Sequence, residues 1–208
     1  MGRVAFLVDG FNLYHSLDDA ARLTGGGTKW LDLRSLCLAN LFQIGAGSLA
    51  SGIYYFSVYA FHLKPEKQSR HEAYVSCLQA CGVHCELSRF KHSKLRCFAC
   101  GSSWARYEEK ETDVAIAVKL LEVFQEDLCD EVVLLSGDTD LSPAIRSAKR
   151  LFPEKGVLCA FPYLRYSEEL EELAHKSFTI SPRQYRQHQF PNPFFISPGK
   201  MVAKPGNW

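Results

Sequence analysis

Short apolar runs that end in Asp constrain the fold of this chain more than any other feature. Residues 4–8 (Val-Ala-Phe-Leu-Val) lead directly into Asp9, and residues 132–135 (Val-Val-Leu-Leu) lead through Ser-Gly into Asp138. Continuous runs of aliphatic and β-branched residues closed by turn formers are typical of strands buried on both faces, as in parallel sheets. The chain is therefore expected to be built around a mainly parallel central sheet.

Strand-like and helix-like segments alternate along the rest of the chain. The pattern predicts further strands at 53–61, 83–89, 156–161 and 178–180, and helices at 13–23, 32–43, 65–80, 110–127, 142–151 and 167–175. Alternation of this kind predicts an α/β fold, a three-layer α/β/α sandwich with helices on both faces of the sheet. A length of 208 residues suits one domain at 1–180. Residues 90–109 form a Cys-containing basic insert, and residues 181–208 form an extended arm or tail.

Composition excludes some classes of protein and leaves others open. The formal net charge is only +1, so bulk charge does not favour a nucleic-acid partner, which must be argued from local patches. No apolar run approaches the ~20 residues of a membrane span, and no signal peptide is evident, so we expect a cytoplasmic protein without a membrane partner. In a reducing compartment its eight cysteines are expected to be buried thiols or metal ligands.

Acidic residues follow the two most apolar strands. Ligands of open parallel sheets bind beyond the carboxyl ends of the strands, so Asp9 and Asp138 are expected to meet at one edge, with Asp140 two residues further on. Such like charges repel unless a cation or a shared proton compensates them. Mg²⁺ and Mn²⁺ prefer oxygen ligands, so the sequence predicts a site for one of these ions. The alternative is that these residues only form turns.

Asp113 is a fourth candidate ligand. It opens the apolar stripe of the helix predicted at 110–127, where an Asp is a poor interior residue. The first turn of a helix also favours carboxylates through the helix dipole, so Asp113 and Glu111 could equally be capping residues. Spacing alone does not decide between these readings.

Three of these segments together resemble the NYN domain family, a branch of the PIN-like ribonuclease superfamily. They are residues 8–12 (Val-Asp-Gly-Phe-Asn), 110–114 (Lys-Glu-Thr-Asp-Val) and 135–140 (Leu-Ser-Gly-Asp-Thr-Asp), and the resemblance spans about residues 3 to 180. It implies a PIN-like fold and metal-dependent cleavage of RNA, in which a metal-activated water attacks a phosphodiester. The site that it implies consists of Asp9, Asn12, Asp113, Asp138 and Asp140, and all four acidic positions are retained.

Other polar residues are candidates for contact with RNA. Asn12, Ser136 and Thr139 lie in the acidic motifs and are expected to orient ligands or to contact phosphate. No His in these motifs could activate Ser136 or Thr139 as a nucleophile. A basic run interleaved with aromatic residues can follow a phosphate backbone while its rings stack on bases, although a solvated hairpin is the plainer reading. This run contains Arg89, Lys91, Lys94 and Arg96.

Cys97 and Cys100 have the spacing of a zinc knuckle but supply only two of the four ligands of a structural site. The missing ligands could come from nearby Cys and His residues or from a second subunit, and two reduced thiols in a turn are the alternative.

The aromatic tail makes a homodimer plausible. For the whole chain, the alternatives to a nuclease are a non-catalytic RNA-binding or scaffold module and an aspartate-based phosphatase, which Phe11 disfavours because such enzymes usually place a second Asp there.

Overall fold

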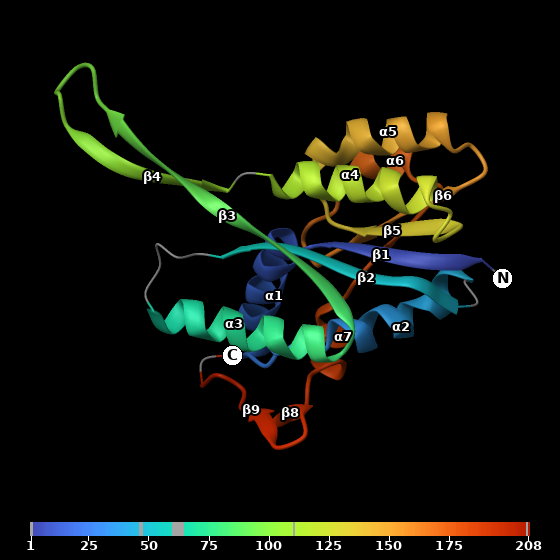
Figure 1. The fold of residues 1–208 in the computed structure, drawn as a ribbon, viewed down its shortest axis with the longest axis horizontal. Coiled ribbons are helices and arrows are strands. Elements are labelled where there is room, and N and C mark those ends of the chain that lie inside the picture. The colour runs from blue at the N-terminus through green and yellow to red at the C-terminus, as the bar shows by residue number, and fades with distance from the viewer. Residues whose placement is uncertain (1, 46–47, 60–64, 110, 207) are drawn as a thin grey trace.

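A parallel sheet forms the centre of the computed structural model, which describes residues 2–45, 48–59, 65–109, 111–206 and 208 (Figure 1). The described strands run in the order β4-β3-β2-β1-β5-β6-β7, and all neighbours are parallel except β3 and β4. The strands are β1 (Arg3–Asp9), β2 (Ser48–Tyr59), β3 (Val83–Arg96), β4 (Ser103–Glu109), β5 (Glu131–Leu135), β6 (Gly156–Phe161) and β7 (Lys176–Thr179).

Helices cover both faces of this sheet, which confirms the predicted three-layer α/β/α class. Helices α1, α2, α3 and α7 lie on one face and α4, α5 and α6 on the other (Figure 1). They are α1 (Gly10–Thr24), α2 (Leu33–Ile44), α3 (Pro65–Ala80), α4 (Thr112–Gln125), α5 (Ser142–Leu151), α6 (Glu168–Leu173) and α7 (Pro182–Gln187). None of the helices within the described residues is both long enough and apolar enough to cross a bilayer.

Strand β1 shows how the sheet divides the core. Successive side chains of a strand point to opposite faces, so Phe6 and Val8 pack in the core beneath α1, whereas Ala5 and Leu7 pack beneath α4 and α5. All four side chains are buried, which is why the run is apolar throughout rather than alternating. The continuous apolar run therefore places β1 at the centre of the sheet, with Asp9 at its carboxyl end.

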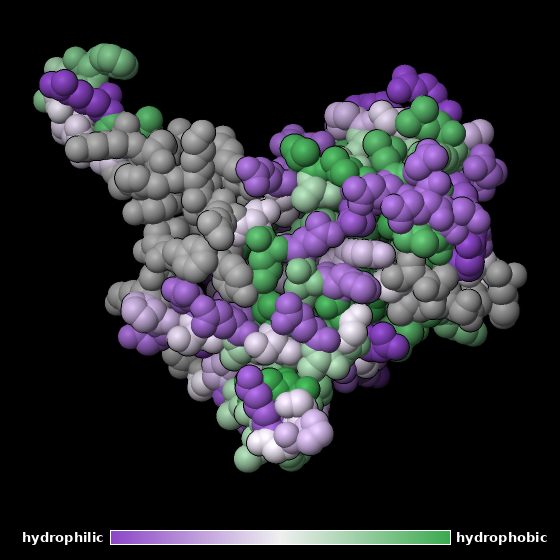
Figure 2. All heavy atoms as spheres, viewed as in Figure 1, coloured by the Kyte–Doolittle hydropathy of each residue, from purple (hydrophilic) through white to green (hydrophobic). Residues whose placement is uncertain are grey.

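The hairpin of β3 and β4 departs from the predicted pattern. The strand predicted to end at residue 89 continues to Arg96, because its backbone pairs with β4 after its pairing with β2 ends at Tyr59. Antiparallel pairing within the hairpin satisfies backbone groups that would otherwise lack partners. The hairpin projects from the body of the molecule (Figure 1), and Phe98 near its tip is fully exposed. Figure 2 shows hydrophobic and hydrophilic atoms together at the tip.

Residues after the last sheet strand pack on the α1 and α3 side of the domain. Helix α7 begins with a capping box at Ser181, and it is followed by a small hairpin of β8 (Phe194–Ser197) and β9 (Lys200–Val202). Tyr185 and Phe190 are buried. The Trp208 ring lies 5.4 Å from the Tyr74 ring and 6.0 Å from the Trp30 ring, measured between centroids. The C-terminal segment thus forms part of the wall of the domain.

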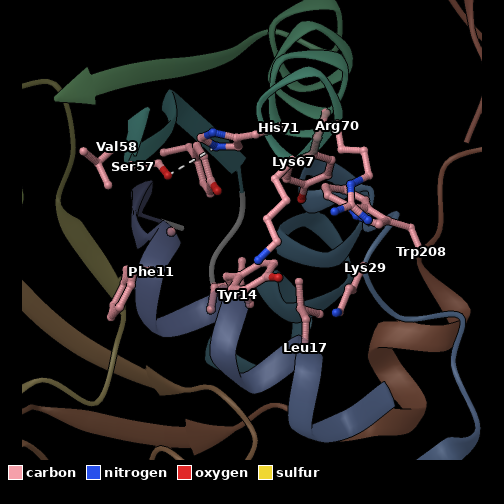
Figure 3. Close-up of a pocket in the computed structure, with 14 residues that line it drawn as sticks. Phe11, Tyr14, Leu17, Lys29, Ser57, Val58, Lys67, Arg70, His71 and Trp208 are labelled. Carbon is pink, nitrogen blue, oxygen red and sulfur yellow. Dashed lines mark hydrogen bonds between the residues drawn. The ribbon is translucent and has the colours of Figure 1, made fainter. Parts of the chain in front are cut away.

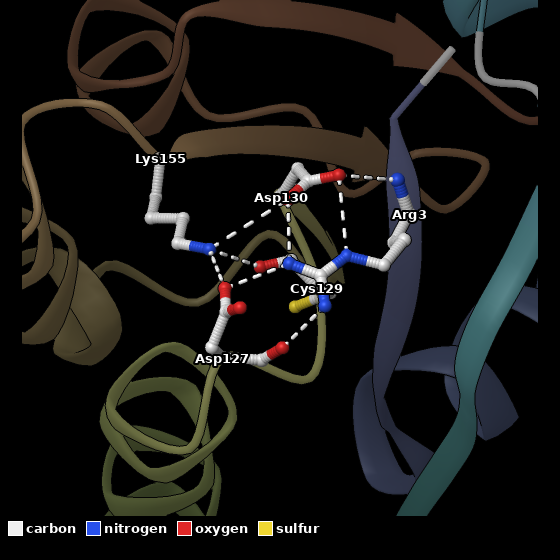
Figure 4. A network of polar contacts seen from close by, with 5 residues as sticks. All are labelled: Arg3, Asp127, Cys129, Asp130 and Lys155. Atoms are coloured by element: carbon white, nitrogen blue, oxygen red, sulfur yellow. Dashed lines mark hydrogen bonds and ion pairs between the residues drawn. The ribbon is translucent and has the colours of Figure 1, made fainter.

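A network of ion pairs ties the amino end of β1 to the loops beside it (Figure 4). The Arg3 guanidinium binds Asp130 at 2.8 Å and Asp127 at 2.7 Å, and Lys155 also pairs with Asp127. These hydrogen bonds hold the pKa of Asp130 well below its usual range. The network lies at the opposite end of β1 from Asp9, and three of its four charged side chains are partly exposed to solvent, which limits what each pair contributes to stability.

Candidate active site

Asp9 is held in place by its position at the junction of β1 and α1. It is the N-cap of α1, where its carboxylate accepts the Asn12 backbone N–H at 2.9 Å. Only 4% of its surface is exposed. A Cβ at Gly10 would lie 2.5 Å from the Phe56 carbonyl oxygen, so the turn into α1 requires glycine. The sequence Asp-Gly therefore buries a carboxylate at the end of the central strand.

Two hydrogen bonds tie the loop after β5 to this junction, and a third lies within the loop. Ser136 Oγ donates to Asp9 Oδ2 at 2.8 Å and accepts the Asp138 backbone N–H at 3.1 Å. The Gly137 backbone N–H donates to Asn12 Oδ1 at 3.2 Å. Ser136 is buried, so these contacts favour the expectation that it orients a ligand over the expectation that it touches phosphate. Through its bond with Gly137, Asn12 likewise links the motif at 8–12 to the motif at 135–140.

Asp113 completes a group of three carboxylates. Oxygen atoms of Asp9, Asp113 and Asp138 all lie within 4.8 Å of one another. Asp113 lies in the first turn of α4, and Glu111 before it occupies the N-cap position with a φ of 81° and no side-chain capping bond. A non-glycine residue in this conformation is strained, and such strain is concentrated at functional sites. The structure therefore brings together the three motifs that lie far apart in the sequence.

The electrostatics of this group fit a divalent cation. Burial, followed by the charges of Asp138, Asp9 and Asp140, raises the pKa of Asp113 to about 6. Three convergent carboxylates are the hard oxygen donors that Mg²⁺ and Mn²⁺ take, and a bound ion would offset their repulsion. Asp140 lies outside the group of three, exposed at its rim, and its N–H donates to Asp138 at 3.0 Å. Thr139, also exposed, lies beside it in the short 3₁₀ helix η1 (Thr139–Leu141).

The model of the NYN domain family matches residues 3–180. The chain belongs to the NYN domain family. NYN domains are a branch of the PIN-like nucleases. The acidic group of this NYN domain contains one Asp from each of the three segments that resemble the family, 8–12, 110–114 and 135–140. Family and geometry together show a PIN-like fold with an acidic group able to hold a metal ion.

Two further comparisons add little on function. No curated protein matches this NYN domain. A crystal structure of a protein of unknown function from Vibrio parahaemolyticus is similar to it, with a TM-score of 0.55 and 20% sequence identity, covering 86% of this chain and 93% of that one. At this identity the likeness supports the fold alone.

The basic run predicted to contact RNA lies along β3. The side chains of Arg89, Lys91 and Lys94 are outside the described residues, whereas Arg96 is exposed near the tip of the hairpin. The base of the hairpin approaches the acidic group, because β4 ends at Glu109, shortly before Asp113. The tip projects away from it (Figure 1). Contact of the run with RNA stays a prediction.

Cys97 and Cys100 lie in a tight turn at the hairpin tip. The Cys97 N–H bonds to the Ser102 carbonyl at 2.8 Å, the Gly101 N–H bonds to the Cys97 carbonyl at 2.9 Å, and Gly101 has a φ of 71°. Hydrogen bonds from Ser102 and Cys97 lower the pKa of the Cys100 thiol to about 7. Among the described residues, only the three carboxylates form a group of three or more metal-ligating side chains. A zinc site here would need ligands from elsewhere, such as a second copy of the chain.

Sequence reasoning missed a second set of residues beside the acidic group. Tyr14, Lys67, Arg70 and His71 line a cavity that begins at Gly10, next to Asp9 (Figure 3). The sequence pattern alone indicates that Lys67 and Arg70 are ordinary surface cations of a helix and that Tyr14 lies at the edge of the core. No local signal marks them, because they come together only when α1 and α3 pack on the same face of the sheet.

Replacing Asp113 by Asn is expected to stabilise the metal-free protein. The folded-state pKa of about 6 lies above the ordinary value of 3.8, so the folded state holds this proton more tightly than the unfolded state. Stability therefore falls as the pH rises between these two values, and above them the charged form costs roughly 1–2 kcal/mol after allowance for solvent screening. Asp113→Asn should raise the Tm in EDTA by about 2–6 °C at pH 7.5 and by much less at pH 4. Thermal unfolding at both pH values measures this, and an equal or lower Tm at pH 7.5 would contradict the repulsion.

Proposed function

We propose that this protein is a metal-dependent ribonuclease that cleaves RNA internally. The observation that carries the proposal is the convergence of Asp9, Asp113 and Asp138 from three separate elements at the carboxyl edge of the sheet. Membership of a PIN-like nuclease family supports the same reaction class. Three carboxylates gathered without a compensating cation would only cost stability, so their arrangement is best explained by an ion that they hold.

Each residue has a distinct role in this proposal. Asp9, Asp113 and Asp138 would hold Mg²⁺ or Mn²⁺, while Ser136 and Asn12 fix the position of Asp9 through the hydrogen bonds described above. When bound, the ion supplies a water of lowered pKa and offsets charge on the phosphate oxygens. The reaction would be hydrolysis: water would add to the phosphorus atom, the bond to the 3′ oxygen would break, and the products would carry a 5′-phosphate and a 3′-hydroxyl. Asp140 and Thr139 lie at the exposed rim, where an incoming phosphate would pass.

We also propose that the enzyme acts in the cytoplasm. Cys37, Cys77 and Cys159 are buried thiols outside any disulfide, and burial raises the pKa of Cys159 to about 12, so this thiol stays protonated and unreactive. Buried thiols of this kind are ordinary in a reducing compartment, where disulfides are rare. RNA is the partner that the family and the acidic group support.

The proposal is tested by incubating the purified protein with end-labelled RNA and with DNA of the same sequence, in Mg²⁺, Mn²⁺ or EDTA. We expect internal cleavage of the RNA with either metal, none in EDTA, and little cleavage of the DNA. Protein that binds RNA but leaves it intact in both metals would instead support a non-catalytic RNA-binding module. Cleavage that persists in EDTA would contradict the role of the three carboxylates.

A further inference from the structure

A cavity of about 270 Å³ opens beside the acidic group, between α1 and α3 (Figure 3). It starts at Gly10 and Phe11, the two residues after Asp9, and continues along Tyr55, Ser57 and Val58 of β2. The sheet register places Phe56 of β2 opposite Asp9, so the cavity and the acidic group share this boundary. The cavity therefore begins one residue along the chain from a carboxylate of the acidic group.

Five Phe, Tyr and Trp side chains contribute to its wall. Tyr55 and Tyr74 are buried, whereas Tyr14 and Phe11 are about half exposed. Trp208 closes the side nearest the C-terminus and packs against Tyr74. Flat apolar surfaces of this kind are suited to a planar aromatic group, such as an unpaired base.

Three cations, Lys29, Lys67 and Arg70, line the cavity, and no carboxylate is among the described residues that line it. Lys29 is neutralised by its ion pair with Asp18 and lies over the Tyr14 ring, 5.4 Å from its centroid. Lys67 and Arg70 make no ion pair within the part of the chain that the structure describes, and Figure 3 shows both at the α3 side of the cavity. They are therefore available to an anion, such as a phosphate.

A polar pair lies at the inner end of the cavity. His71 Nε2 and Ser57 Oγ lie 3.4 Å apart, at hydrogen-bond distance. Burial lowers the pKa of His71, so its ring is neutral at physiological pH. A neutral imidazole beside a hydroxyl can both donate and accept hydrogen bonds, as recognition of a base edge or a ribose hydroxyl requires.

We propose that this cavity is a subsite for one unpaired nucleotide of the RNA strand, next to the phosphate that is cleaved. The base lies among the rings of Tyr14, Tyr55 and Trp208, and its phosphate binds Lys67 and Arg70. The cavity volume of about 270 Å³ is slightly below the usual range for ligand sites, roughly 300–1,000 Å³, so it suits one base better than a base pair. This inference rests on the proposed function, and it specifies single-stranded RNA as the substrate class.

Binding in EDTA tests the subsite separately from catalysis. The probe is a fluorescein-labelled oligouridine of twelve nucleotides, and its affinity is measured by fluorescence anisotropy for wild type, for Lys67→Gln with Arg70→Gln, and for Tyr14→Ala. Arg150→Gln is the matched control, because Arg150 is an exposed cation at the end of α5 on the other face of the sheet. Thermal unfolding establishes that each variant folds.

We expect the double variant and Tyr14→Ala each to weaken RNA binding at least about tenfold, since each loses phosphate contacts or a stacking surface, and the control to change it less than twofold. An unchanged affinity for both cavity variants, or an equal loss in the control, would overturn the proposal. A blunt duplex should bind much more weakly than the single strand, and equal affinity would also count against it.

Competition by 5′-uridylate separates a strand subsite from a site for a free nucleotide. If the mononucleotide binds as tightly as the oligonucleotide, the assignment to the RNA strand is wrong. A different result would contradict the proposed function: wild-type protein would leave RNA intact in Mg²⁺ and Mn²⁺, while the cavity variants would still bind RNA more weakly than wild type. If wild-type protein cleaves RNA and the cavity variants bind RNA as tightly as wild type, the subsite proposal is wrong and the nuclease proposal stands.

Discussion

Replacing Asp138 by Asn is expected to reduce metal-dependent RNA cleavage by roughly a hundredfold or more, without a loss of stability. The carboxylate of Asp138 is one of three that lie within 4.8 Å of one another, and an amide is a much weaker ligand for Mg²⁺ or Mn²⁺. Loss of one of three ligands both weakens metal binding and misplaces the water that attacks the phosphodiester.

The fold should tolerate this change for two reasons. Asn retains a side-chain oxygen that can accept the Asp140 N–H, which Asp138 binds at 3.0 Å at the start of η1. Removal of one negative charge also relieves the repulsion that raises the pKa of Asp113. The Tm in EDTA is therefore expected to stay equal or to rise.

Initial cleavage rates in saturating Mn²⁺, together with thermal unfolding in EDTA, measure both parts of this prediction. Glu154→Gln is a suitable control, because Glu154 is an exposed carboxylate just before β6, at the opposite edge of the sheet. A variant that cleaves RNA at the wild-type rate would exclude Asp138 as a ligand. One that fails to fold would assign it a structural role.

Gly137→Ala is expected to damage both the fold and the site. A Cβ at this position would lie 1.7 Å from the carbonyl oxygen and 2.8 Å from the carbonyl carbon of Arg165. Both are backbone atoms, so no side chain can rotate away and one of the two loops must move. Relief of such overpacking is expected to cost about 3 kcal/mol or more, which corresponds to a fall in Tm of roughly 6–12 °C.

Catalysis should suffer beyond the loss of stability. Movement of the loop would break the hydrogen bond from Gly137 to Asn12 and displace Ser136, which binds Asp9 at 2.8 Å. Cleavage measured well below the Tm of the variant is therefore expected to fall at least tenfold. Gly206→Ala is the control, because a Cβ at Gly206 would meet no atom within 4 Å. A Gly137→Ala protein as stable and as active as wild type would show that the two loops are not packed as described.

Local sequence signals were sufficient to predict an element when the residues that begin it, end it and form its buried face all lie within one segment. The helix predicted at 65–80 is α3 (Pro65–Ala80), because proline suits a first helical turn and Gly82 follows the last one. The helix predicted at 32–43 is α2, and its first predicted residue, Asp32, is the N-cap, whose carboxylate accepts the Ser35 N–H. The apolar run at β1 places Asp9 at the carboxyl edge of a buried strand by the same kind of argument.

Asp113 shows where local reasoning stops. A carboxylate in the first turn of a helix has an adequate explanation in the helix dipole, so the sequence around it could not separate capping from metal binding. The answer depends on where α4 lies relative to β1 and β5. Packing of α4 against the sheet brings Asp113 to Asp9 and Asp138. Glu111, at the N-cap position, makes no side-chain capping bond, so the capping explanation does not hold for that residue.

The apolar and acidic pattern of the chain by itself determined the α/β class, the central strands and the edge at which the acidic residues emerge, since each depends on residues close together in sequence. Tertiary structure decided the roles of the polar side chains. Ser136 orients Asp9 because two loops meet, and the cavity exists because α1, α3 and Trp208 close around one space. Such contacts join residues separated by most of the chain, and no local preference of those residues encodes them.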